Sequence, residues 1–113
     1  MKVAIGMQTS LSLLLAIGLT PVAAFAAEPD GRELYEANCA KCHGPDGKAT
    51  TPVSKAMKAP SLVDSPIAKG DTHSLKEKIG AIDKHKPITS KLTPEEFDAI
   101  AGAVHAMANP KKH

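Results

Sequence analysis

The apolar residues near the end of the chain repeat with the period of an amphipathic helix. Counted from the first, they stand three, four, seven and eleven positions on, which places them on one face: Phe97, Ile100, Ala101, Val104 and Ala108. Thr93 is suited to cap such a helix, Pro94 suits its first position and Glu96 completes a capping box. Asn109 and Pro110 supply a stop signal. The pattern therefore predicts a helix over about residues 94–108.

Two more helices are predicted earlier in the chain. Asp30 follows Pro29 and precedes Glu33 by three positions, which is typical of a helix start. This helix should end at Gly44-Pro45. A shorter helix is expected over about residues 72–82, where leucine and isoleucine recur at helical spacing.

The remaining segments have little periodicity. Residues 44–60 contain glycine, proline, threonine and lysine, residues 83–91 contain proline, threonine and lysine, and no segment alternates as a strand does. The prediction is a small all-α fold of three or four helices with long loops. Loops of this length are unusual in a compact domain unless something orders them.

The first residues have the composition of a secretory signal peptide. Lys2 is followed by an uncharged stretch whose centre, residues 11–19, is strongly apolar. Pro21 interrupts it, and Ala24-Phe25-Ala26 matches a small-x-small cleavage site. We therefore expect residues 1–26 to be removed on export. The alternative is a retained membrane anchor, because the uncharged stretch is long enough to span a bilayer.

Composition limits what the remaining single domain, residues 27–113, can do. Cleavage removes Lys2, one of 14 lysine and arginine residues that face 12 acidic ones, and leaves a nearly neutral domain. Nucleic-acid binding is disfavoured, since it requires a strong basic excess. Only two aromatic residues remain, Tyr35 and Phe97, so the domain has little bulk for a core. A large apolar cofactor would supply that bulk, and we expect the chain to be largely disordered without it.

The segment Cys39-Ala40-Lys41-Cys42-His43 has the pattern of a c-type haem attachment site. Two thiols three positions apart lie about one helical turn apart, so both can reach the vinyl groups of one haem. His43 then approaches the iron from the same side. A thioredoxin-like dithiol would follow a strand, and a zinc site would need more ligands than these two cysteines, the only ones in the chain.

Around this motif the chain resembles class I cytochromes c. The similarity is carried by residues 31–47, by Pro60-Ser61-Leu62 and by residues 92–96 with the helix after them. The resemblance implies that the first and last helices cross and that one covalent haem c lies in a loop-lined crevice. It also implies that His43 is the proximal iron ligand and that the carbonyl of Pro60 accepts a hydrogen bond from its ring.

One departure concerns the sixth ligand of the iron. The family usually carries a methionine followed by proline before the last helix, whereas this chain has Lys86 there, beside His85. His85 is the preferred candidate, because a neutral imidazole binds haem iron well. Met57, a neutral Lys86 and an open site are the alternatives. Met107 is expected in the core. The other histidines are expected at the surface: His73, His105 and His113.

Two functions from different classes follow. The first is a periplasmic electron-transfer protein with one haem, two histidine ligands, a lowered reduction potential and no enzymatic activity. The second is a haem protein that binds or senses a small ligand at a weak or open sixth position. As an electron-transfer protein, it is expected to dock with redox partner proteins that have acidic surfaces. It is expected to associate with a membrane only if the signal segment is retained. The lysines expected to guide docking lie around the motif: Lys41, Lys48, Lys55 and Lys58.

Overall fold

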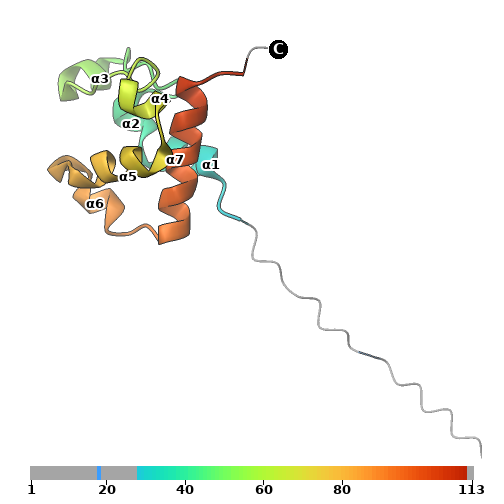
Figure 1. Ribbon diagram of the computed structural model, residues 1–113. Coiled ribbons are helices and arrows are strands. Elements are labelled where there is room, and N and C mark those ends of the chain that lie inside the picture. Colours follow the sequence, from blue (N-terminus) through green and yellow to red (C-terminus); the bar gives the residue numbers. More distant parts are fainter. Residues whose placement is uncertain (1–17, 19–27, 112–113) are drawn as a thin grey trace, which may run out of the picture.

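The computed structural model describes Gly18 and residues 28–111 of the chain. These residues form seven α-helices and one short 3-10 helix, with no strand among them (Figure 1). The elements in chain order are α1 (Gly31–Asn38), α2 (Ala40–His43), α3 (Pro52–Met57), α4 (Pro66–Lys69), α5 (Thr72–Ala81), η1 (Asp83–His85), α6 (Lys86–Thr89) and α7 (Pro94–Ala108). The predicted all-α class is confirmed.

The first and last helices pack against each other, as the resemblance implied (Figure 1). Gly31, at the start of α1, lies so close to the backbone of Ala99 in α7 that a β-carbon would overlap it. Close approach lets the two helices bury Tyr35 of α1 between them, together with Ile100 and Val104 of α7. This contact is the main apolar core of the domain.

The helix boundaries follow the capping signals in the sequence. Asp30 accepts hydrogen bonds from the amides of Arg32 and Glu33 and so caps α1. Thr93 and Glu96 form the predicted capping box at the start of α7, with Pro94 in the first position. The predictions for these two helix starts are confirmed.

α5 and α4 both pack against α7 and also contact each other. Lys76 of α5 pairs with Asp98 of α7, and its ammonium lies 5.4 Å from the centre of the Phe97 ring. On α4, the carbonyl of Ala68 accepts a hydrogen bond from Nδ1 of His105 at 3.0 Å. The expectation that His105 is a surface residue was therefore wrong, because half-burial and this bond give it a structural role.

The segments predicted to be irregular contain short helices. α3 and α4 lie between α2 and α5, while η1 and α6 lie between α5 and α7. α3 starts at Thr51-Pro52, where the threonine oxygen accepts from the amide of Ser54. α4 starts at the similar pair Ser65-Pro66. A cap residue followed by proline predicts a helix start, but runs of four to six residues are too short to show periodicity.

The predicted signal peptide, residues 1–26, lies outside the described residues apart from Gly18. Among the helices described, none is both long and apolar enough to cross a membrane.

Candidate cofactor site

A cavity of about 480 Å³ opens between the haem-type motif, α5, α7 and the η1–α6 segment. Its volume is within the range of about 300–1,000 Å³ that is usual for cofactor sites. The wall is mostly apolar and its members come from elements far apart in sequence: Leu62, Leu75, Ile79, Ile82, Ile88, Leu92, Phe97, Ile100 and Val104. The apolar face predicted for α7 therefore serves both the core and this cavity.

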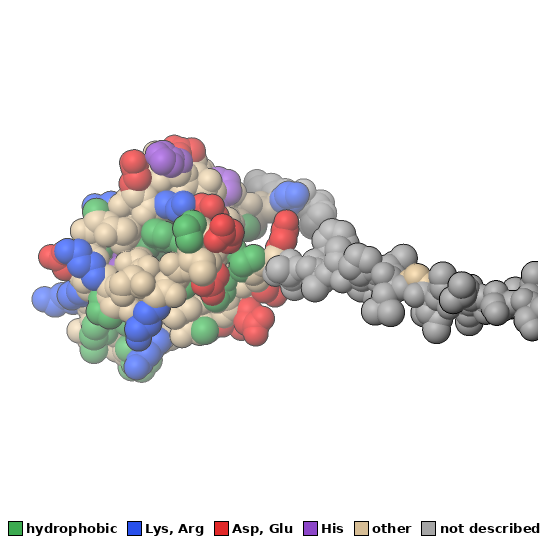
Figure 2. All heavy atoms as spheres, turned by 90° about the horizontal axis from the view of Figure 1, so that it is seen from below, with side chains coloured by type: hydrophobic (Ala, Val, Ile, Leu, Met, Phe, Trp, Pro, Cys, Tyr) green, Lys and Arg blue, Asp and Glu red, His purple; other side chains and the backbone are tan. Residues whose placement is uncertain are grey.

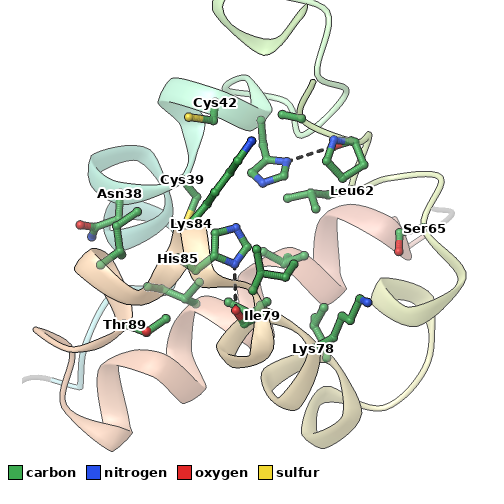
Figure 3. A pocket seen from close by; sticks show the side chains of 18 of the residues that line it. Asn38, Cys39, Cys42, Leu62, Ser65, Lys78, Ile79, Lys84, His85 and Thr89 are labelled. Carbon is green, nitrogen blue, oxygen red and sulfur yellow. Dashed lines mark hydrogen bonds between the residues drawn. The ribbon is translucent and has the colours of Figure 1, made fainter. Parts of the chain in front are cut away.

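Cys39 and Cys42 lie on one side of this cavity (Figure 3). α2 brings them together: the amide of His43 donates to the carbonyl of Cys39 at 2.9 Å, which closes a helical turn over the motif. Burial, together with the neighbouring Cys42, raises the pKa of Cys39 to about 11. Cys39 is therefore a protonated thiol at neutral pH. Redox-active dithiols have a lowered thiol pKa, so this environment disfavours the thioredoxin-like interpretation.

Tyr35 fixes the end of the motif. Its buried hydroxyl donates to the carbonyl of Gly44 at 2.7 Å. Burial is the main reason that the pKa of Tyr35 rises to about 12, so the hydroxyl remains a donor at neutral pH. Gly44 itself has φ +84°, a conformation that favours glycine, and it ends α2 as the sequence predicted.

His43 lies at the end of α2 with its ring in the cavity. Its Nδ1 is 2.9 Å from the carbonyl oxygen of Pro60, which is the hydrogen bond that the resemblance implied. A carbonyl only accepts, so Nδ1 carries the proton and Nε2 keeps a free lone pair. Burial lowers the pKa of His43, with a smaller contribution from His85 in the same direction, so the neutral ring is favoured.

His85, labelled in Figure 3, lines the same cavity as His43, and the two rings lie near each other there. It lies at the end of η1, and its Nδ1 is 2.8 Å from the carbonyl oxygen of Ile79 at the end of α5. The same reasoning gives Nδ1 the proton and leaves Nε2 free. Each of the two imidazoles thus donates its Nδ1 hydrogen to a backbone carbonyl of its own part of the cavity wall. The role of Ile79 was not predicted, because a backbone acceptor leaves no mark in the sequence.

The spacing of the two rings fits a metal ion between them. Their centres are 6.2 Å apart, with 59° between the ring planes. A metal ion bound by two imidazoles lies about 2 Å from each nitrogen, as in zinc sites. With roughly 1.1 Å from each nitrogen to its ring centre, the ring centres would be about 6 Å apart. His43 and His85 therefore suit the iron of a haem whose vinyl groups bond to the two cysteines.

The charges of the cavity wall also suit haem, which carries two carboxylates. Three lysines line the cavity, namely Lys58, Lys78 and Lys84. Within the described part of the chain, no aspartate or glutamate joins them on the wall. An apolar wall with an excess of positive charge suits a flat apolar cofactor that carries negative charge.

The other candidate ligands differ in their positions. Met57 lines the cavity but remains open to solvent, since the residue is 45 % exposed. Lys86 pairs with Asp83 at 2.8 Å and does not line the cavity. Met107 packs against the core, as expected. His73 is at the surface, with 82 % of its side chain exposed, and His113 lies outside the described residues.

Comparison with known proteins identifies the family of this chain. The model of the family described as "Cytochrome C oxidase, cbb3-type, subunit III" matches residues 26–102. No curated protein and no solved structure matches the chain significantly. The matched region covers the motif, every residue of the cavity wall except Val104, and the first nine residues of α7. The chain therefore belongs to this family of c-type cytochrome domains.

Proposed function

We infer that the protein is an electron-transfer protein with one covalently bound haem, and that His43 and His85 are the two axial ligands. The observation that carries this proposal is the pair of neighbouring imidazoles, each with its Nδ1 hydrogen held by a backbone carbonyl. Membership of the family supports the coarser statement, a c-type cytochrome with covalently bound haem c.

Each residue of the site has a separate role in this proposal. Cys39 and Cys42 would fix the cofactor through thioether bonds, while Pro60 orients His43 through its carbonyl. The apolar wall excludes water and lowers the local dielectric constant around the site. When bound, haem supplies a one-electron ferric–ferrous couple. Because imidazole stabilises ferric iron better than a thioether does, we expect a lower potential than in methionine-ligated relatives.

We further propose that residues 1–26 are cleaved on export and that residues 27–113 work as one domain in the bacterial periplasm. The charged start, the apolar stretch and the Ala-x-Ala sequence at residues 24–26 support export. An oxidising compartment also suits a domain with two cysteines destined for covalent attachment.

The partner we propose is a redox protein with an acidic docking surface. The charged side chains that line the cavity in the described structure are all lysines, and one of them, Lys58, belongs to the predicted docking group. Figure 2 shows lysine and arginine side chains gathered along the left and lower edges of one face, with most acidic side chains toward the right. Such a separation of charge favours one docking orientation and a rate that falls with added salt.

The proposal is tested by the reaction of the ferrous protein with carbon monoxide. With both axial positions filled by histidine, we expect binding to be slow and limited by release of His85. A His85→Ala variant should bind carbon monoxide much faster, with His43 retained. Rapid binding by the unmodified protein would contradict the proposal and support the second function, binding of a small ligand at an open position.

A further inference from the structure

The cavity has two different polar ends. Figure 3 shows Cys39, Cys42 and Lys84 on one side of it, and Ser65 and Lys78 on the other. The cysteine side is assigned to attachment of the cofactor. On the opposite side, Lys78 has so far counted only toward the positive charge of the wall and Ser65 has had no role, although they present an ammonium group and a hydroxyl to the same cavity.

The hydroxyl of Ser65 is not used to cap its helix. Four other helices have an oxygen-bearing residue at this position, and in each the side chain accepts a backbone hydrogen bond: Asp30, Thr51, Asp71 and Thr93. Ser65 occupies the same position before α4 and makes no such bond. The half-buried hydroxyl lines the cavity instead, so it is available to a bound group.

The ammonium group of Lys78 is also without a counter-charge. Lys78 lies in the last turn of α5. Its helix neighbour Lys76 pairs with Asp98, and Lys86 pairs with Asp83, but Lys78 forms no ion pair with any residue that the structure describes. Because the described wall has no carboxylate, no acidic group of the wall would compete with a bound anion for Lys78.

We propose that Lys78 and Ser65 bind the propionate carboxylates of the haem, an inference that rests on the proposed function. The vinyl groups and the propionates of haem lie on opposite edges of the macrocycle. Since Cys39 and Cys42 hold the vinyl edge, the carboxylates face the side with Lys78 and Ser65. The ammonium group supplies a charge-assisted hydrogen bond and the hydroxyl a neutral one.

The test uses the haem-loaded protein and two readouts other than activity. The first is the nuclear magnetic resonance positions of the haem propionate methylene groups in the ferric protein. The second is the equilibrium reduction potential at fixed pH. Lys78→Gln removes the charge, Lys78→Arg keeps it and Ser65→Ala removes the hydroxyl. Lys84→Gln is the matched control, because it removes the same charge from the cysteine side of the same cavity.

We expect Lys78→Gln to shift the propionate resonances and to lower the potential, since a nearby positive charge disfavours ferric iron. Ser65→Ala should shift the same resonances by less, and Lys78→Arg should restore both readouts. Lys84→Gln should leave the propionate resonances in place. Unchanged resonances in Lys78→Gln, or equal shifts in Lys84→Gln, would overturn the inference. A normal low-spin spectrum in those samples would show that the proposed function itself still stands.

Discussion

Gly31 of α1 lies directly against the backbone carbonyl of Ala99 in α7, with no room for a β-carbon between them. This contact sets how closely the first and last helices approach. Tyr35 and Ile100 are buried beside it, and α1 leads directly into the motif with Cys39. The position of the cysteines relative to α7 therefore depends on a residue that touches no cofactor.

Gly31→Ala should destabilise the protein by about 1–3 kcal/mol, the usual cost of forcing extra atoms into a packed contact. A backbone carbonyl cannot turn aside as a flexible side chain can, so the helices must separate. Unfolding of the haem-loaded protein in guanidinium chloride measures the effect. Gly102→Ala is the matched control, since a β-carbon at Gly102 meets nothing within 4 Å. It should stabilise α7 by up to about 1 kcal/mol. Equal stability of the two variants would contradict the role given to Gly31.

Tyr35→Phe tests the link between α1 and the end of the motif. The change keeps the buried ring and removes the hydroxyl that donates to the carbonyl of Gly44. Because that carbonyl then lacks a partner in a buried site, we expect a loss of about 1–3 kcal/mol in unfolding free energy. The measurement is the denaturant midpoint at constant slope. A midpoint equal to that of the unmodified protein would show that water replaces the hydroxyl without cost.

The N-cap of α5 should make stability depend on pH in the acid range. The amide and hydroxyl of Ser74 donate to Asp71 and hold the pKa of its carboxyl below the usual value. A depressed pKa means that the folded chain binds this proton less readily than the unfolded chain does. The contribution is thus complete above about pH 4 and is lost as the pH falls through the folded pKa.

Asp71→Asn keeps a capping oxygen but cannot titrate. The difference in unfolding midpoint between the two proteins should therefore shrink from pH 5 to pH 3. Comparing them at each pH cancels contributions from other titrating groups, including the histidines. A difference that stays constant over this range would rule out titration of Asp71 as a source of the pH dependence.

The haem-free chain should be largely disordered. The structure has a cavity of about 480 Å³ in a domain whose fully buried apolar residues are few, with Tyr35 the only aromatic among them in the described part of the chain. A variant with both Cys39→Ala and Cys42→Ala, purified without haem, should show weak helical circular dichroism and no cooperative thermal transition. Cooperative unfolding would mean that the helices pack without the cofactor.

The sequence predicted the elements with strong local signals and missed those that depend on distant contacts. α7 was predicted from a cap and an apolar face together, α1 from its cap residues, and α5 from the spacing of its apolar residues. The short helices α3 and α6 contain too few residues for a periodic pattern. His105 was misplaced because the carbonyl of Ala68 that it contacts lies 37 positions away.

The residues of the candidate site also include some whose proximity the sequence predicts and others whose positions depend on packing. Cys39, Cys42 and His43 form one compact motif, so their proximity follows from the sequence. The position of His85 near His43 depends on where α5 ends, since Ile79 supplies the acceptor for its ring. The place of Lys78 opposite the cysteines likewise follows only from packing of α5 against α7.

Replacing the second histidine should raise the reduction potential. In His85→Met a thioether takes the place of an imidazole, and a thioether favours ferrous iron. The matched control is His73→Met, which makes the same change at an exposed position away from the cavity. The control should leave the potential unchanged in equilibrium titrations. A fall in the potential of His85→Met would contradict His85 as a ligand.

The most direct test of the central claim is the ferric absorption spectrum of the mature protein, made in a host that attaches haem c and recorded into the far red. Ligation by His43 and His85 predicts a low-spin spectrum without the weak band that marks a bond between sulfur and iron. A sulfur band would contradict this and assign the sixth position to a methionine, with Met57 the one on the cavity wall. A high-spin spectrum would also contradict it, because the sixth position would then be open.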